Sequence, residues 1–115
     1  MEVRVTVAVA QILRELLADP EQPRYGYELM QLTDFPSGKL YPILARLENA
    51  GWLVKEREQV DPAQIGRPPR RLYRLTDAGA ERARHELAVL REQILPARPA
   101  VRPGYRVLKP QDHPI

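Results

Sequence analysis

The chain of 115 residues contains no cysteine and only two histidines, His85 and His113. Without cysteine, the protein has no disulfide, no thiolate nucleophile and no thiolate metal ligand. Two histidines far apart in the sequence do not form the closely placed set that a zinc enzyme or a Ser-His-Asp hydrolase needs. We therefore expect a protein that is not an enzyme and that carries no metal and no cofactor.

Long apolar runs are also missing, because no segment approaches the roughly 20 residues that span a bilayer. The first residues, Met1 to Arg4, do not have the pattern of a signal peptide. We therefore expect a cytoplasmic protein without a membrane partner. The composition, with 43% hydrophobic and 29% charged residues, is typical of one globular domain or of a small domain with a tail.

The net charge of +3 is unevenly distributed along the chain. Residues 1–60 contain seven basic and nine acidic side chains, whereas residues 61–75 and residues 96–115 each contain four basic and one acidic. The positive charge is thus concentrated in one short segment and in the C-terminal tail. This distribution indicates a surface that binds a polyanion, and an ordinary solvated surface is the alternative.

Hydrophobic periodicity predicts four helices and two strands. A third helix would begin at Ser37, whose hydroxyl is expected to act as its N-cap, and would end with Gly51 in a left-handed cap. Alternating valines near the N-terminus also fit a strand start in place of the first turn of the first helix. The helices are expected at about 5–19, 25–32, 37–50 and 77–95, and the strands at 52–60 and 70–75, with an irregular loop at 61–69.

Two short helices joined by a tight turn and followed by a β-hairpin describe a winged helix-turn-helix. The fold class is therefore mainly α with a small β-hairpin. We predict a winged helix-turn-helix DNA-binding domain at residues 1–76, a C-terminal dimerisation helix at 77–95 and a proline-rich basic tail at 96–115. Two alternatives are open for the tail: it is a free arm that binds DNA, or it folds back on a partner subunit.

On a helical wheel, the third helix has a leucine-rich side and an opposite side of small residues. Gly38, Pro42, Ala45 and Asn49 form this outer face, and longer polar side chains flank it. Small side chains let a helix approach base edges in the major groove, although a plain surface helix is the alternative. The candidate DNA contacts on this helix are Ser37, Gly38, Lys39, Tyr41, Pro42 and Arg46.

The segment from Gly66 to Arg71 contains three arginines among prolines. Arginine forks match phosphate oxygens and also suit a narrow minor groove, and the prolines restrict the loop. A solubilising turn is the alternative, but the position directly after the candidate reading helix favours DNA contact. The candidate residues here are Arg67, Arg70 and Arg71.

Three blocks of the sequence resemble the PadR family of bacterial transcriptional regulators. They are residues 25–29 (YGYEL), 38–53 (GKLYPILARLENAGWL) and 66–79 (GRPPRRLYRLTDAG), in the order in which that family has them. The resemblance implies a homodimeric winged-helix protein, usually a repressor, whose third helix enters the major groove of double-stranded DNA. It also implies that a small hydrophobic effector between the subunits is a possible ligand.

The last helix has an apolar stripe with steps of three and four, which is a heptad seam. This pattern favours a dimer interface, and packing on the helix's own domain is the alternative. The expected interface residues are Ala80, Ala83, Leu87, Leu90 and Ile94. The sequence thus predicts a homodimeric, sequence-specific DNA-binding transcriptional regulator, and the alternative is a winged-helix module that binds proteins and not DNA.

Overall fold

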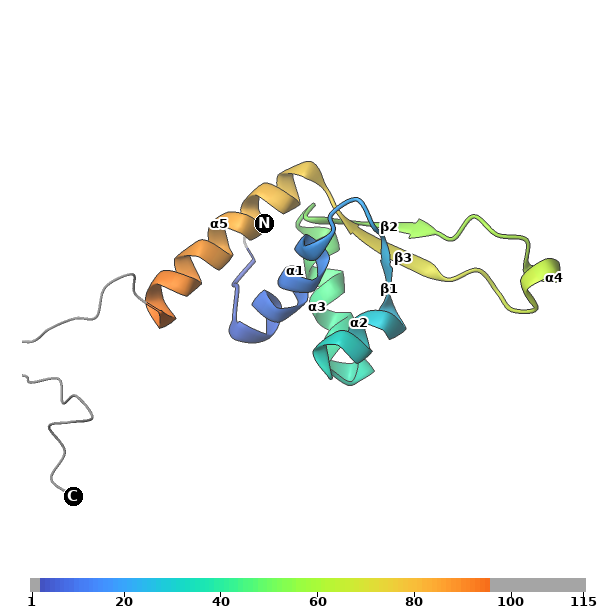
Figure 1. Cartoon of the computed structure of the whole chain (residues 1–115), viewed down its shortest axis with the longest axis horizontal. Coiled ribbons are helices and arrows are strands. Elements are labelled where there is room, and N and C mark those ends of the chain that lie inside the picture. The colour runs from blue at the N-terminus through green and yellow to red at the C-terminus, as the bar shows by residue number, and fades with distance from the viewer. Residues whose placement is uncertain (1–2, 96–115) are drawn as a thin grey trace, which may run out of the picture.

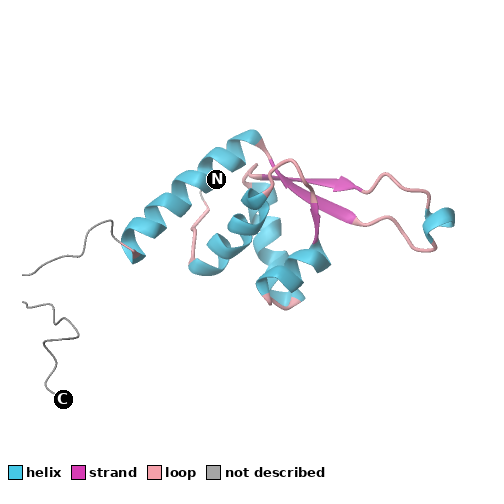
Figure 2. Cartoon of the chain, in the orientation of Figure 1, coloured by secondary structure: helices cyan, strands magenta, loops and turns pink. Residues whose placement is uncertain are grey.

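The structure is a computed structural model that describes residues 3–95. The predicted tail at 96–115 lies outside the described residues. Within them, the chain is mainly helical with a small antiparallel sheet, which confirms the predicted fold class (Figures 1 and 2). The elements are α1 (Val7–Ala18), β1 (Arg24–Tyr25), α2 (Gly26–Thr33), α3 (Ser37–Asn49), β2 (Leu53–Arg57), α4 (Pro62–Ile65), β3 (Arg71–Leu75) and α5 (Asp77–Ile94).

The helix α3 begins differently from its prediction. Pro36 is the N-cap, and its carbonyl oxygen accepts hydrogen bonds from the amides of Lys39 and Leu40, both at 3.0 Å. Ser37 is therefore the first helical residue, and no side chain caps the helix. The prediction that Ser37 is the cap was wrong because proline, with its fixed φ, already supplies the extended residue that precedes the helix.

Boundary signals are clear at two other helix ends, and the predicted left-handed cap at Gly51 is confirmed. Gly51 follows α3 with a φ of +80°, a conformation that glycine adopts without steric cost. Thr76 is the N-cap of α5, and its hydroxyl oxygen accepts a hydrogen bond from the amide of Gly79 at 2.9 Å. These signals fix the point where the chain leaves α3 for the sheet and the point where it leaves the sheet for α5.

The sheet has three strands in the order β1-β3-β2, all antiparallel. Only the β2–β3 hairpin was predicted. Strand β1 pairs with β3, with Tyr25 opposite Leu72, although the sequence pattern placed Tyr25 in a helix. Two residues are too short to show an alternating pattern, so periodicity missed this strand.

The hairpin projects away from the helices as the wing of the fold (Figure 1). Its strands are shorter than predicted, and its loop contains one helical turn, α4, where irregular structure was expected. The carboxylate of Asp61 caps this turn by accepting a hydrogen bond from the amide of Ala63 at 3.0 Å. The loop is therefore an ordered structure.

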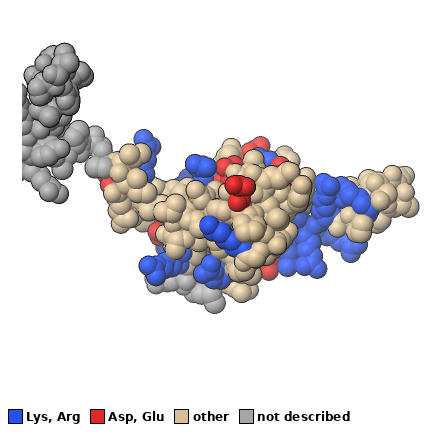
Figure 3. Space-filling model, turned by 90° about the horizontal axis from the view of Figure 1, so that it is seen from below, with Lys and Arg blue, Asp and Glu red and all other residues tan. Residues whose placement is uncertain are grey.

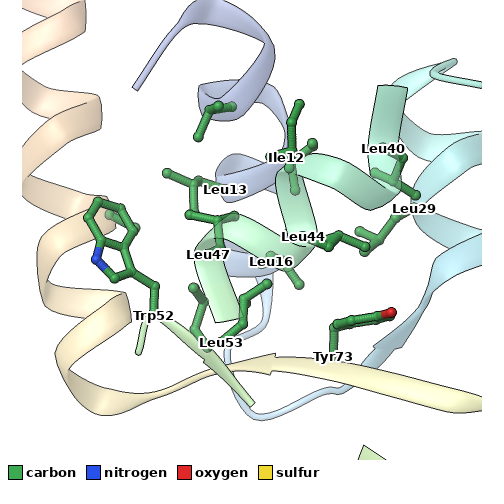
Figure 4. Packing of buried hydrophobic residues seen from close by; sticks show 14 of the residues in the cluster. Ile12, Leu13, Leu16, Leu29, Leu40, Leu44, Leu47, Trp52, Leu53 and Tyr73 are labelled. Atoms are coloured by element: carbon green, nitrogen blue, oxygen red, sulfur yellow. The ribbon is translucent and has the colours of Figure 1, made fainter. Parts of the chain in front are cut away.

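The core lies between the helices and one face of the sheet (Figure 4). The apolar side of α3 forms its centre, because its leucines are at most 1% exposed and lie against α1, α2 and Leu53 of β2. Trp52 closes the core between α3 and α5. This burial leaves the opposite side of α3 to the solvent. The α3 residues in the core are Leu40, Ile43, Leu44 and Leu47.

The N-terminal half of α5 packs within its own chain. Ala80 is 7% exposed and Ala83 is fully buried, and both belong to the core cluster. These two residues, predicted for a dimer interface, are covered mainly by their own chain, as the alternative of packing on the helix's own domain expects. The same spacing of three and four describes a stripe that faces the core and a stripe that faces a partner, which is why the sequence did not separate them.

Candidate nucleic-acid interface

The outer face of α3 is exposed in the described part of the chain. Gly38, Pro42, Ala45 and Asn49 are all exposed, as the helical wheel predicts. The flanking residues of the predicted interface, Ser37, Lys39, Tyr41 and Arg46, are exposed as well. The helix backbone therefore comes close to the molecular surface along this face.

Lys39 is held in place at the N-terminal end of this face. Its Nζ atom lies 4.0 Å from the centroid of the Phe35 ring, which is itself nearly buried. A cation over an aromatic ring is attracted by the negative face of that ring. The ammonium group of Lys39 is thereby positioned near the first turn of α3.

A groove of about 350 Å³ joins α3 to the wing. Tyr41 contributes from α3, and Arg70 and Arg71 contribute from the wing. The guanidinium carbon of Arg70 lies 4.3 Å from the centroid of the Tyr25 ring, so β1 supports this arginine. We call this site the tyrosine–arginine groove, and the residues that line it are Tyr25, Gly26, Tyr27, Tyr41, Arg70, Arg71 and Tyr73.

Gly26 shapes the floor of the tyrosine–arginine groove. A Cβ atom at this position would overlap the hydroxyl end of the Tyr41 ring. The absence of a side chain therefore lets Tyr41 lie against the start of α2. Tyr73 also lines this groove, and burial raises the pKa of its phenol.

Arg67, one of the predicted DNA contacts, is paired with a carboxylate of the wing. Its Nη1 and Nη2 atoms donate to Oε1 and Oε2 of Glu58 at 2.7 and 3.2 Å. Oε1 of Glu58 also accepts from the amide of Arg70 at 3.1 Å. These bonds to Arg67 and Arg70 lower the pKa of Glu58 to about 2. Arg67 therefore closes the neck of the wing loop.

Sequence reasoning missed two basic residues of β2. Lys55 and Arg57 are exposed and stand opposite Tyr73 and Arg71 in the register with β3. The Nζ atom of Lys55 is 3.8 Å from a carboxylate oxygen of Glu48 on α3, so this side of the hairpin faces the reading helix. Side chains alternate along a strand, so the sequence does predict that Lys55 and Arg57 share one face of β2. It does not predict which residues of β3 lie opposite them. Figure 3 shows the basic side chains gathered where the wing joins the body.

Neither a metal site nor a membrane span is found in residues 3–95. No group of three or more His, Asp or Glu side chains there could hold a metal ion. No helix in that range is long and apolar enough to cross a membrane.

A helix-turn-helix whose second helix, α3, lies beside a basic β2–β3 hairpin defines a winged helix-turn-helix protein. Residues 15–85 match the model of the transcriptional regulator PadR-like family, and the chain belongs to this family. This match confirms the family that the three sequence blocks indicated. The members of the family are transcriptional regulators.

Solved structures with the same fold support this assignment. The chain is similar to a PadR-like transcription factor from Bacteroides fragilis, with 28% identity over 76% of this chain and 84% of that chain and a TM-score of 0.62. It is also similar to smu.1704 from Streptococcus mutans, with 29% identity over 82% and 90% and a TM-score of 0.58. MepR of S. aureus, solved in complex with DNA, shares the fold at 14% identity over 79% and 68%, with a TM-score of 0.62. A comparison with curated proteins gave no significant match.

Proposed function

We propose that this transcriptional regulator is a homodimeric, sequence-specific DNA-binding repressor. The tyrosine–arginine groove is the observation that carries the proposal, because it links the exposed face of α3 to two wing arginines on one side of the molecule. A protein of the same fold, MepR, has been solved with DNA, which supports a nucleic-acid ligand for this architecture. A dimer bound across a promoter would exclude the polymerase, and this is the basis of the repressor role.

Each part of the interface has a role in the proposed complex. The outer face of α3 is narrow enough to enter the major groove, where Lys39 meets a guanine edge and Tyr41 meets a thymine methyl or a phosphate. The free amides of the first turn of α3, together with Ser37, bind a phosphate because the helix N-terminus is electropositive. Arg70 and Arg71 hold the flanking backbone. Gly38 and Pro42 matter for their small size, and Arg46 reaches a phosphate farther along the groove.

DNA recognition is tested by selecting binding sites from random duplexes with the intact protein. We expect a near-palindromic site, and affinity for it should fall steeply with salt because bound phosphates release counterions. Lys39→Ala should reduce the preference for the selected site over a scrambled duplex by about tenfold, measured by fluorescence anisotropy.

The matched control for this test is Arg14→Ala, which removes an exposed positive charge from α1. It should leave the preference for the selected duplex unchanged. If the wild type bound no duplex in a salt-dependent way, the proposed function would be wrong, and the winged-helix protein-interaction module would replace it.

The proposed dimer interface uses the C-terminal half of α5. Leu87 and Leu90 are half-buried in the single chain, and Ile94 is 58% exposed. Leu87 still packs partly against the core, and Leu90 and Ile94 extend the apolar stripe beyond that contact. Pairing of this stripe with its symmetry mate would bury apolar surface that a domain of this size leaves exposed.

Dimerisation is tested with the double variant Leu90→Asp and Ile94→Asp. The wild type should sediment as a dimer at concentrations on the order of tens of micromolar, and the double variant as a monomer of 13.2 kDa. His85→Asp, on the opposite side of α5, provides a control that should remain dimeric. A monomeric wild type at these concentrations would refute the interface.

A further inference from the structure

Two arginines face each other across the wing strands with no acidic partner. Arg57 of β2 stands directly opposite Arg71 of β3, and both side chains are exposed. Residues directly opposite in an antiparallel pair have Cβ atoms about 5 Å apart, and like charges at this spacing destabilise the sheet. Within residues 3–95, neither guanidinium has a carboxylate within 4.0 Å.

The other arginines of the wing are supported by neighbours. Arg67 is paired with Glu58 at the neck of the loop, and Arg74 is paired with Glu56 on the opposite face of the hairpin. Arg70 lies over the ring of Tyr25. The carboxylates of the hairpin are thus committed elsewhere, and the repulsion between Arg57 and Arg71 is left unbalanced.

The opposed pair borders a second groove, which lies on the wing itself. This groove of about 360 Å³ is lined by both arginines together with Lys55, Glu56, Pro68 and Pro69. Arg71 also lines the tyrosine–arginine groove, so it borders both grooves. A strand of DNA that follows the tyrosine–arginine groove would pass Arg71 and reach Arg57.

We propose that Arg57 and Arg71 form a two-arginine clamp for one phosphate of the DNA backbone, and that Arg57 is a DNA-contacting residue of β2. The inference rests on the proposed function and extends the interface from the loop and α3 to a strand. Two guanidinium groups on one phosphate give charge-assisted hydrogen bonds, and the phosphate neutralises the repulsion between them. The repulsion in the free protein and the contact in the complex thus have a common explanation.

The test uses the full chain with Arg57→Ala, Arg57→Glu and the charge control Arg14→Glu. Arg57→Ala should lower affinity for the selected duplex by about tenfold, because one of the two guanidinium contacts is lost, and should reduce the salt slope by less than about one, because Arg71 still holds the shared phosphate. Arg57→Glu should weaken binding further, yet it should raise the thermal midpoint of unfolding because it places a carboxylate opposite Arg71. Arg14→Glu should change duplex affinity less than threefold.

The two readouts separate this inference from the proposed function. If the wild type and the Arg57 variants bound duplex with equal affinity and salt slope, the clamp would be refuted while DNA binding stood. A lower thermal midpoint for Arg57→Glu would also contradict the unbalanced pair. Absence of duplex binding by the wild type would overturn both the function and the clamp.

Discussion

The double variant Arg70→Ala and Arg71→Ala should lose about a hundredfold in affinity for duplex DNA, whatever its sequence. Both residues line the groove that connects the wing to Tyr41 of α3. Each contact with a phosphate accounts for a slope of about −0.9 in a plot of log affinity against log salt. The slope should therefore become shallower by between about one and two, because Arg57 still holds the phosphate that it shares with Arg71. Fluorescence anisotropy titrations at several salt concentrations measure both quantities.

Charge alone is controlled by a second double variant, Arg14→Ala and Arg84→Ala. These residues are exposed on α1 and α5, and their removal lowers the net charge by the same amount. Because they lie outside the tyrosine–arginine groove, the control should keep most of its affinity and nearly all of its salt slope. Equal losses in the two double variants would mean that DNA responds only to net charge, and the wing would have no special place in the interface.

The reading helix was predictable because its signal is long and local. Thirteen residues of α3 carry a regular leucine pattern, and that pattern fixes both the buried side and the exposed side. Pro42 also favours a helix start near Ser37, because proline is tolerated only close to the first turn, and α3 does begin at Ser37. The sequence therefore identified the outer face, although it assigned the cap to Ser37 when Pro36 supplies it.

The electrostatics of the wing were not predictable from local pattern. Glu58 lies nine residues before Arg67 and twelve before Arg70, and only the path of the loop brings them together. The opposition of Arg57 and Arg71 depends on strand register, which the loop length and the turn at α4 determine. Composition identifies a basic segment, but the pairing decides which arginines remain available.

The apolar stripe of α5 shows a different limit. The apolar residues do recur at the predicted spacing, but this spacing does not show which surface packs against the stripe. Small residues at Ala80 and Ala83 allow α5 to pack closely on its own core, whereas Leu90 and Ile94 lie beyond the end of that contact. Residue size along the stripe was the available signal, because two alanines bury little area against a second subunit.

Gly79→Ala should cost about 2–3 kcal/mol of unfolding free energy, a large share of the stability of a small domain. Gly79 is buried in the first turn of α5, and a Cβ atom there would overlap the backbone carbonyl of Trp52. That carbonyl also accepts a hydrogen bond from the amide of Thr76 at 2.9 Å, and the Thr76 hydroxyl donates to the carbonyl of Gly51 at 2.8 Å. The backbone cannot retreat without breaking these bonds.

Gly38→Ala is the matched control for this substitution in urea unfolding. A Cβ atom at Gly38 has no other atom within 4 Å, and alanine is favoured over glycine in a helix by up to about 1 kcal/mol. The control should therefore be at least as stable as the wild type. Its methyl group would still lie on the outer face of α3 and should weaken binding to the selected duplex. Equal stability of the two alanine variants would show that α5 does not meet Trp52 as closely as this fold requires.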